Sequence, residues 1–485
     1  MLNVENQPYK NLPLYEQVAG RISFLIEQGT LRPGDRVPSI RNLSRQMQVS
    51  INTVKEAYSQ LEDRRLLEAR PQSGFYVRAR LPELPTDPPF DHPALITPTE
   101  VNLANVYGLV MRDLLNPALL QLGIATPNNE LLPVAKLNRM LARETRRLGQ
   151  EAVSYQLPPG NLRLRQQIAQ RLLLSGCTLS AEQIVITSGC VEAVALALKT
   201  LCQPGDTVAI ETPFYFNFLQ LIEDLGLKAL EIPVSPRGGI SLEALEYALD
   251  RHHRQIKACL VIANFNNPLG SLMADQDKKR LVALLQRYRI PLIEDDVYGD
   301  LAFSGVRPSV AKAYDSTGNV LLCSSFSKTL APGYRVGWIA AGRYQEKIER
   351  GKMISGVAST SPTQLAIAEF LANGGYDHHL RTICRSYARQ VARMADAIGR
   401  CFPEGTKVSR PRGGFVLWVE MPHNVNALTL YEQAKVRGIS IAPGQLFSVE
   451  GKFANCIRLT AAVWSPAVES ALQTLGSLAR QLSLT

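Results

Sequence analysis

Two patterns of apolar residues divide the chain. Near its start, Leu14, Val18, Ile22 and Leu25 recur at the spacing of one helical face, which predicts an amphipathic helix. Much further along, short apolar runs alternate with helical patterns, and each run ends in a turn of polar or small residues. Strand, turn and helix in repeated order is typical of a doubly wound α/β domain with a mostly parallel sheet, whose ligands lie beyond the carboxyl ends of the strands.

The first eighty residues continue into a helix-turn-helix pattern. Ser39 can cap a second helix over Ile40–Met47, a short turn follows, and a third helix begins at Ser50 or Asn52. Two short helices joined by a tight turn bring the N-terminal residues of the second one to the DNA major groove. Here those residues are Ser50, Asn52, Thr53 and Lys55. Residues 66–68 and 74–77 are expected to form the two strands of a wing.

This segment closely resembles the winged helix of the GntR regulators. The matching residues are Leu31–Arg41, Val49–Val54, Ala57, Tyr58 and Leu61. The resemblance implies DNA contacts by Arg36, Arg41, Asn52, Thr53, Lys55 and Gly74. Two residues depart from the pattern: Ile51 stands where some relatives have Arg, and Arg65 stands where Gly often ends the third helix.

Charge and composition narrow the class of protein. Residues 1–80 contain twelve Lys or Arg and eight Asp or Glu, a net +4 that suits phosphates but that a merely solvated face also explains. The whole chain carries +10, and it contains neither a secretory signal nor an apolar run long enough to cross a membrane. Its eight Cys include no CxxC pair, which argues against disulfides and a metal site. We therefore expect a reduced, cytoplasmic protein without a metal.

A proline-rich stretch separates the first segment from the rest. Six prolines between Leu81 and Glu100 exclude a helix or a central strand, and such a stretch behaves as a semi-rigid spacer. We expect a DNA-binding domain over residues 1–80, a linker over 81–104 and a larger domain over 105–485. The C-terminal small subdomain of that larger domain is expected at about 356–485.

Candidate chemistry gathers after the last apolar run, Val320–Cys323. The stretch after this run contains Ser325, Ser327, Lys328 and Arg335. A Lys at the end of a buried strand can have a lowered pKa and attack an aldehyde, while two hydroxyls and an Arg suit a phosphate. Together they indicate pyridoxal 5′-phosphate held as a Schiff base. Taken alone, the same residues also fit a surface Lys beside a structural Arg.

Each of the other turns supplies one part of a site for the same cofactor. The residues concerned are Ser188, Gly189, Cys190, Tyr215, Asn267, Asp295 and Tyr298. The first three open a helix whose N-terminus suits a phosphate. Tyr215 can stack on the ring, Asp295 can pair with a protonated pyridine nitrogen, and Asn267 and Tyr298 can both reach the phenolate oxygen. Singly, Asp295 also fits a helix cap and Asn267 a plain turn, but their ordered co-occurrence favours the cofactor.

From about Asn105 onward, the chain resembles the fold-type I aminotransferases of the aspartate aminotransferase superfamily. The motifs are Tyr155 with Gly160 and Leu164–Arg165, Ser188–Gly189, Pro213–Tyr215, Asn267–Gly270, Asp295–Tyr298, Ser325–Lys328, Pro332–Gly337 and Cys456–Leu459. The resemblance implies that Tyr155 reaches the phosphate across a dimer interface and that Arg458 grips a substrate α-carboxylate. The alternative for Arg458 is a structural ion pair. Cys190 and Val191 replace a hydroxyl residue and a Gln that are common in the phosphate turn, so weaker cofactor binding is expected.

Winged helix, linker and aminotransferase-like region together resemble the MocR-type subfamily of GntR regulators over essentially the entire chain. The resemblance implies a head-to-tail homodimer that binds operator DNA and senses an amino compound or pyridoxal vitamer through aldimine chemistry. The alternative is an aminotransferase for amino acids and 2-oxo acids with a fused DNA-binding module, because Lys328 and Arg458 leave the catalytic set intact. The winged helix favours regulation, since a metabolic transaminase has no need of it.

Overall fold

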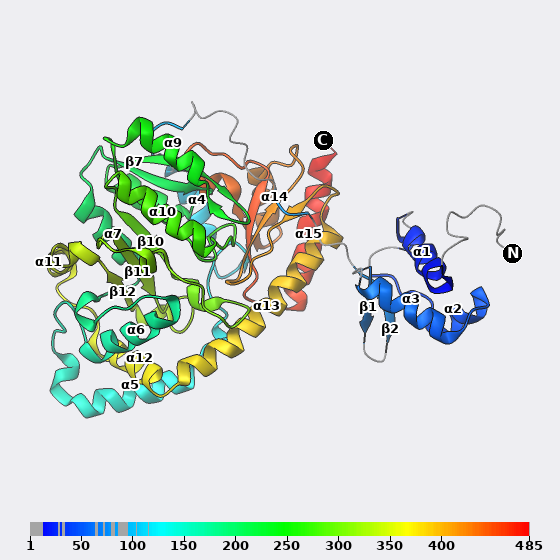
Figure 1. The fold of residues 1–485 in the computed structure, drawn as a ribbon, viewed down its shortest axis with the longest axis horizontal. Coiled ribbons are helices and arrows are strands. Elements are labelled where there is room, and N and C mark those ends of the chain that lie inside the picture. Colours follow the sequence, from blue (N-terminus) through cyan, green and yellow to red (C-terminus); the bar gives the residue numbers. More distant parts are fainter. Residues whose placement is uncertain are drawn as a thin grey trace. The chain divides into compact units, whose positions relative to one another are not determined.

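The computed structural model describes residues 13–27, 30–31, 34–63, 66–70, 73–78, 83–85, 96–102, 104–114 and 116–484 (Figure 1). Two compact units make up the chain: the first runs to Pro82, and the second comprises nearly all of the remaining residues. Arg65 and most of the predicted linker over 81–104 lie outside the described residues. Within the described ranges, no helix is both long and apolar enough to cross a membrane.

The first unit is a winged helix-turn-helix. Its helices and wing strands are α1 (Leu14–Glu27), α2 (Ile40–Met47), α3 (Ile51–Asp63), β1 (Leu67–Arg70) and β2 (Gly74–Val77). The two strands pair antiparallel. The predicted inner face of α1 is buried at Val18 and Ile22, whereas Leu14, at the first position of the helix, is 58% exposed.

Local hydrogen bonds and one small core fix the geometry of this unit. The Ser39 side chain caps α2 by accepting from the backbone N–H of Asn42 at 3.3 Å, as the sequence predicts. Tyr58 is fully buried at the centre of the core. Its hydroxyl donates to the Pro38 carbonyl at 2.6 Å, and its ring packs edge-on against Phe75 of the wing, with 5.0 Å between centroids. The core therefore ties α3 to both α2 and the wing.

A nine-stranded, mostly parallel sheet forms the centre of the second unit. The strands lie in the order β3-β7-β6-β9-β10-β11-β12-β5, with β8 beside β7. The series from β7 to β11 is parallel, whereas β12 runs antiparallel to both of its neighbours. This arrangement confirms the predicted α/β fold class. The strands are β3 (Thr99–Glu100), β5 (Val185–Thr187), β6 (Thr207–Thr212), β7 (Lys228–Ser235), β8 (Gly239–Ile240), β9 (Ile256–Val261), β10 (Leu292–Asp295), β11 (Val320–Ser325) and β12 (Gly337–Ala340).

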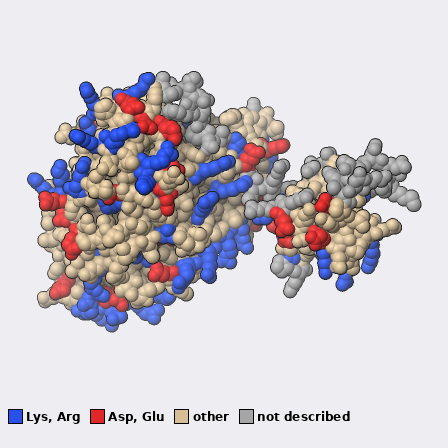
Figure 2. Space-filling view, viewed as in Figure 1, with Lys and Arg blue, Asp and Glu red and all other residues tan. Residues whose placement is uncertain are grey.

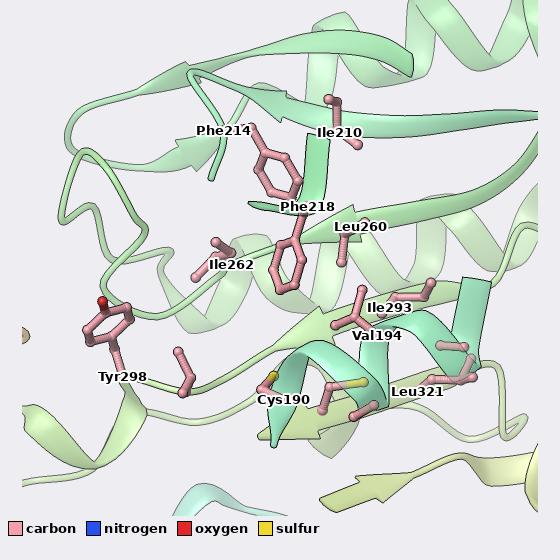
Figure 3. Close-up of a cluster of buried hydrophobic side chains, with 14 of the residues drawn as sticks. Cys190, Val194, Ile210, Phe214, Phe218, Leu260, Ile262, Ile293, Tyr298 and Leu321 are labelled. Atoms are coloured by element: carbon pink, nitrogen blue, oxygen red, sulfur yellow. The ribbon is translucent and has the colours of Figure 1, made fainter. Parts of the chain in front are cut away.

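Helices bury the central strands. The helices up to the start of the C-terminal part are α4 (Ala104–Leu114), α5 (Val134–Leu148), α6 (Leu162–Leu172), α7 (Cys190–Leu201), α8 (Phe216–Asp224), α9 (Leu242–His252), α10 (Asp275–Arg287), α11 (Gln345–Gly356) and α12 (Ser361–Ala372). Figure 3 shows Val194 of α7 beside Leu260, Ile293 and Leu321 from three neighbouring strands, and all four are fully buried. Strands that are covered in this way need continuous apolar runs, which is the pattern that predicts them.

The C-terminal part adds a smaller antiparallel sheet with its own helices. The helices are α13 (Gly375–Cys401), α14 (Ala427–Val436) and α15 (Pro466–Ser483). The sheet has the order β13 (Lys407–Val408), β14 (Val416–Glu420), β17 (Cys456–Thr460) and β16 (Ala442–Pro443). A short parallel pair, β4 (Leu120–Gln121) with β15 (Ile439–Ser440), joins the start of the unit to this part. The pairing brings the residues just after β4 close to Arg458 in β17.

Candidate cofactor site

The predicted cofactor residues come from the ends of neighbouring strands. Asp295 ends β10, Ser325 ends β11, Asn267 lies in the turn after β9, and Gly189 lies between β5 and α7. Strands β9, β10 and β11 are adjacent in the sheet, and β5 lies beyond β12 and runs in the same direction as β11, so the turns after these four strands lie at one edge. This is the edge at which open parallel sheets bind ligands.

Lys328 lies in an environment that favours a neutral amine. Its Nζ donates to the backbone carbonyl of Ala125 at 2.6 Å and lies 6.0 Å from the centre of the Tyr298 ring. Burial, and after it the positive charge of Arg458, lower the pKa of Lys328 from 10.5 to about 8. At pH 7, about a tenth of such amines are neutral, roughly 300 times the fraction of an ordinary Lys. Lys328 can therefore serve as a nucleophile near neutral pH.

Asp295 is a buried carboxylate without an ion-pair partner in the described part of the chain. Its Oδ1 accepts from the Cys190 thiol at 3.2 Å and from the Val297 N–H at 3.0 Å. Burial raises the pKa of Asp295 to about 6, although both hydrogen bonds and the charge of Lys328 oppose the rise. A cationic N–H group would relieve the desolvation of this carboxylate. A protonated pyridine nitrogen has that chemistry.

The turn before α7 (Ser188, Gly189 and Cys190) and Arg335 lie together and are here called the anion grip, after the phosphate contacts predicted for them. The guanidinium of Arg335 lies across Gly189, whose φ is +108°, and donates from Nη2 to the Ser188 carbonyl at 2.8 Å. The N–H of Ser188 is taken by Glu192 Oε2 at 2.5 Å. The N–H groups of Gly189 and Cys190, at the helix N-terminus, lack intrahelical acceptors and point where an anion binds well.

Ser325 is the last residue of β11, and Ser327 follows two positions later. Ser325 is buried, and its hydroxyl accepts from the backbone N–H of Ser327 at 3.4 Å. Ser327 is half-buried and directly precedes Lys328. The spacing that the sequence shows therefore places both hydroxyl residues beside the amine in the folded chain.

Two tyrosines of the predicted cofactor site lie in aromatic surroundings, and Tyr298 is the one beside Lys328. Tyr215 is half-buried, and its ring packs edge-on against Phe218 at 5.3 Å between centroids. Tyr298 is 1% exposed, and its buried hydroxyl has no hydrogen-bond partner among the described residues. A buried hydroxyl without a partner is uncommon in folded proteins. It fits a site whose ligand offers an acceptor such as a phenolate oxygen.

Arg458 is fully buried and has only neutral partners among the described residues. Its Nη1 donates to Asn267 Oδ1 at 3.1 Å, its Nη2 donates to the Gly123 carbonyl, and its Nε has no partner. The guanidinium carbon lies 5.7 and 5.3 Å from the ring centres of Phe216 and Phe447. Burial lowers the pKa of Arg458. Because none of the described carboxylates pairs with it, the structure gives no support to the structural ion pair considered as its alternative role.

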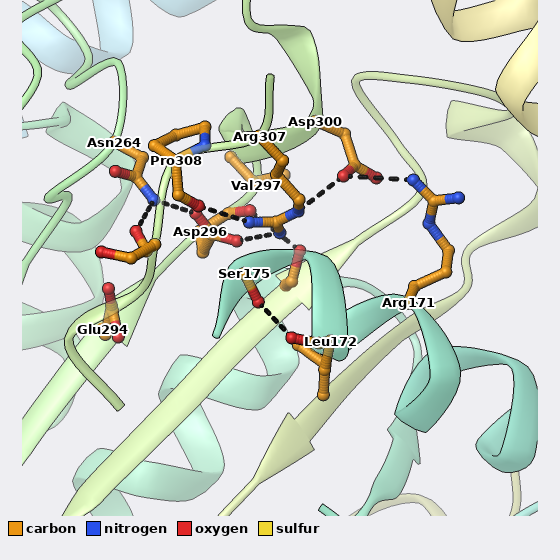
Figure 4. Close-up of polar contacts among 12 residues, drawn as sticks. Arg171, Leu172, Ser175, Asn264, Glu294, Asp296, Val297, Asp300, Arg307 and Pro308 are labelled. Carbon is orange, nitrogen blue, oxygen red and sulfur yellow. Dashed lines mark hydrogen bonds and ion pairs between the residues drawn. The ribbon is translucent and has the colours of Figure 1, made fainter. Parts of the chain in front are cut away.

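An ion network behind the site holds the turn after β10 (Figure 4). Asp296 accepts from Asn264 Nδ2 at 2.8 Å and pairs with Arg307. Arg307 also binds Asp300 through Nε at 2.7 Å, and Arg171 Nη2 lies 3.4 Å from the same carboxylate. These pairs fix the backbone on both sides of the turn. Asp295 is thereby held with its side chain at Cys190 instead of in the network.

Several groups at the site have no signal in the sequence. The carbonyls of Gly123 and Ala125 hold Arg458 and Lys328, but any residue carries a carbonyl, so residue type does not reveal them. Glu192 carries no sequence signal for a role here either, although it accepts from the Ser188 N–H and binds the buried Lys352 at 2.9 Å. A Glu in the first turn of a helix is common because the helix dipole favours it.

Tyr155 stands apart from these residues within one chain. Its side chain is 81% exposed, in the segment between α5 and α6. The role that the resemblance implies for it requires a second copy of the chain and stays a prediction.

In the first unit, the predicted DNA-reading residues lie at the start of α3. Asn52 and Lys55 are exposed, and Thr53 is half-buried. Ser50 caps the helix by accepting from the Thr53 N–H at 3.0 Å, and the two hydroxyls lie 2.8 Å apart. The Ser50 hydroxyl therefore serves the helix end, while Asn52 and Lys55 remain available to a ligand.

Arg36, Arg41 and Gly74 lie on the surface of the same unit. Arg36 pairs with the wing at Tyr76. Its guanidinium packs over Gly74, where an added Cβ would lie 3.4 Å from Nε and where φ is +102°. Arg41 is exposed in the first turn of α2. The structure thus brings together Arg36 and Gly74, two residues for which the resemblance to GntR regulators implies a contact with DNA.

Two known protein families match separate parts of the chain. The family of bacterial regulatory proteins named gntR matches residues 14–77, and the family Aminotransferase class I and II matches residues 119–475. The uncharacterized HTH-type transcriptional regulator YjiR of Escherichia coli is 39% identical over 463 residues, which are 95% of this chain and 98% of YjiR. This chain is a MocR-type GntR regulator. It is thus a transcription regulator with an aminotransferase-like domain.

Solved structures show the fold of the larger part of this MocR-type regulator. A kynurenine aminotransferase of Pyrococcus horikoshii matches with a TM-score of 0.73 and 26% identity, over 79% of this chain and 95% of that one. The α-aminoadipate aminotransferase LysN of Thermus thermophilus matches with a TM-score of 0.71 and 28% identity, over 78% and 96%. The LysN structure contains N-(5′-phosphopyridoxyl)-L-leucine. The aminotransferase-like domain of this regulator therefore has the fold-type I architecture.

Proposed function

We propose that this regulator binds operator DNA through its winged helix and takes up pyridoxal 5′-phosphate at Lys328. Its affinity for DNA changes when a small amino compound or a pyridoxal vitamer occupies the cofactor site. One observation carries the proposal: a single chain joins a GntR winged helix to a buried Lys328 whose pKa is about 8, beside the unpaired carboxylate of Asp295.

The residues of the site fit pyridoxal phosphate group by group. When bound, this cofactor supplies an aldehyde that bonds amines and a ring that accepts electrons. Lys328 Nζ is the amine that would condense with the aldehyde, with loss of water, and Asp295 would accept a hydrogen bond from the ring N–H. The amides of Gly189 and Cys190, with Arg335, hold the phosphate. The partnerless Tyr298 hydroxyl donates to the ring oxygen.

Tyr215, Asn267, Ser325 and Ser327 complete the same proposal. Tyr215 covers one face of the ring, Asn267 shares the ring oxygen with Tyr298, and the two serine hydroxyls add donors for the phosphate. Tyr155 of a second chain reaches the phosphate in the head-to-tail homodimer that we propose. Its 81% exposure leaves it free to do so. A cytoplasmic location is part of the proposal, since operator DNA is there.

Arg458 is the residue that connects an effector to the shape of the domain. It lies in β17 of the smaller sheet, yet it binds Asn267 after β9 and the Gly123 carbonyl after β4. An effector carboxylate competes for the same guanidinium donors, while the effector amine takes the place of Lys328 Nζ. A ligand shifts an equilibrium only through different affinities for two states. Exchange of the Arg458 partners provides such a difference, and movement of one layer against the other is a common outcome.

An operator-selection experiment tests the proposed function. Random DNA fragments are incubated with the full-length protein, with and without pyridoxal phosphate, and the retained fragments are sequenced. The proposal predicts one enriched, repeated motif in both samples or a motif that appears only with the cofactor. Asn52→Ala serves as a matched variant, because it changes the reading helix and leaves the cofactor site intact. Retention without any sequence preference contradicts the proposal.

A second function, transamination, has support from one observation. Arg458 is buried and has no carboxylate partner among the described residues, so a substrate carboxylate can bind it, and the Lys328 amine would be the group that moves a proton. The test is a single-turnover reaction with excess protein, monitored by loss of the amino acid. Loss of the amino acid with the wild type and no loss with Lys328→Ala would establish the first half-reaction of a transaminase beside regulation.

A further inference from the structure

A row of arginines follows one face of α13, outside the cofactor site. Arg381, Arg385, Arg389 and Arg393, here called the arginine row, recur at every fourth position. Residues four apart lie on the same helical face. Between Arg381 and Arg393 the helix contains no Asp or Glu; its two acidic residues, Asp377 and Asp396, lie on either side of the row.

All four side chains are exposed and available. None of the described carboxylates forms a salt bridge with any of them, in contrast to Arg400 near the helix end, which pairs with Asp396 at 3.2 Å. Charged surface residues of folded proteins usually alternate in sign. Four guanidiniums without a partner on one face therefore form a local concentration of positive charge.

A second helix also carries exposed basic residues. Burial lowers the pKa of His379 in α13, the charge of Lys136 in α5 lowers it further, and the Lys136 side chain is exposed. Arg139, one turn further along α5, is exposed as well. Figure 2 shows Lys and Arg side chains gathered along the position of α13. Outside residues 1–80, which carry +4, the chain still has a net charge of +6.

The length of the arginine row is enough to span several phosphates of a DNA duplex. Twelve residues of helix separate its ends, a length of about 18 Å. One strand of duplex DNA carries a phosphate per 3.4 Å of axis, so about five phosphates lie along that length. Arginine forks bind phosphate oxygens in pairs, which Gln or Lys does less well.

We propose that the arginine row is a second DNA-contacting surface, which binds the phosphate backbone of duplex DNA without reading its sequence. The inference rests on the proposed DNA-binding function, but it adds a contact surface on the aminotransferase-like domain. Phosphate contacts raise affinity for every sequence and make binding depend steeply on salt. The winged helix then selects the DNA sequence, while the arginine row strengthens the binding of the DNA to the protein.

The salt dependence of binding tests the row directly. A duplex that contains the selected operator with long flanks is titrated with full-length protein from about 50 to about 300 mM salt. Each phosphate contact contributes about 0.9 to the slope of log K against log salt. Changing all four arginines of the row to Gln should therefore lower the slope by about 2 to 4. Changing them to Lys should restore most of the slope, because the charge returns.

A matched variant controls for loss of net charge. Arg237, Arg254, Lys257 and Lys279 are also exposed, on or near α9 and α10, and their change to Gln removes the same four charges. This control should lower the slope by less than about 1. Equal slopes for the row variant and the control overturn the inference. A change of oligomeric state in the row variant alone also overturns it, because the row would then be a contact between copies.

The two proposals fail in distinguishable ways. If the wild type shows no preference for any sequence, the proposed operator recognition is wrong. The row is still tested in that case, because the same comparison of slopes can be made on random-sequence duplex. If the wild type prefers its operator and the row variant matches the control, the proposed function stands and the arginine row is a solvated face.

Discussion

Gly189→Ala is a substitution that should disturb the anion grip and leave the other residues of the cofactor site in place. Gly189 has φ +108°, a conformation that alanine adopts with strain of about 1–3 kcal/mol. The added Cβ would overlap Arg335 Nη2 and lie 3.1 Å from Cζ. The nearest atoms belong to the end of a flexible side chain, so we expect Arg335 to swing away while the fold persists. Gly333→Ala is the matched control, because no heavy atom lies within 4 Å of its added Cβ.

The expected loss of cofactor affinity comes from the displaced guanidinium. A hydrogen bond to a charged group contributes about 1.5–3 kcal/mol, which corresponds to a factor of about 10 to 150 in Kd. Titration of the apo-protein with pyridoxal phosphate, monitored by its absorbance, measures that factor. Gly333→Ala should bind within about twofold of the wild type, since no contact of the grip changes.

A double-mutant cycle decides whether the alanine acts through Arg335. If it does, Gly189→Ala combined with Arg335→Gln should lose little more affinity than either single variant, with a coupling of at least about 1 kcal/mol. Wild-type cofactor affinity in Gly189→Ala would refute the assignment of Arg335 to the phosphate. Fully additive losses would instead mean that the alanine acts through the amides of the turn.

Three further predictions concern the nucleophile, the ring partner and the reading helix. The rate of cofactor uptake by Lys328 should rise about tenfold per pH unit below pH 8 and level off above it, because only the neutral amine reacts. A rate that continues to rise up to pH 10 would contradict the lowered Lys328 pKa of about 8. Cys190→Ala removes a donor to Asp295, so the pKa of Asp295 should rise above about 6 and cofactor affinity should fall more at pH 6 than at pH 8; equal losses in titrations at the two values would exclude this effect. Asn52→Ala should cost about 1–3 kcal/mol on the operator alone, whereas Lys55→Ala should weaken binding to all DNA and lower the salt slope by about 0.9, as binding isotherms on operator and random duplexes would show.

The pattern of apolar residues predicted the central architecture because burial leaves a strong mark on residue type. Strands such as β11 are covered on both faces, so they read as continuous apolar runs that end where a functional turn begins. Local caps were equally visible: Ser39 caps α2 as the sequence predicts, and Ser50, one of the two residues predicted to begin the third helix, caps α3. These features depend on neighbours within a few positions.

Contacts between distant residues were not predictable in the same way. The thiol of Cys190 meets Asp295 across 105 positions, and Arg171 meets Asp300 across 129. Single residue types say nothing about such pairs, because the sheet order decides which turns meet. The sequence placed Cys190 in the phosphate turn, whereas the structure shows its thiol as a partner of Asp295, the carboxylate that is proposed to hold the ring.

The most direct test of the account measures operator affinity while the cofactor site is changed. The cofactor-loaded wild type, Lys328→Ala and Arg458→Ala are titrated onto a labelled operator across a panel of amino acids and pyridoxal vitamers. The account predicts that at least one amino compound changes the affinity of the wild type. It also predicts that Arg458→Ala diminishes this response with unchanged basal affinity, and that Lys328→Ala abolishes the dependence on covalent cofactor. Wild-type affinity that is indifferent to every compound and to pyridoxal phosphate itself would contradict it.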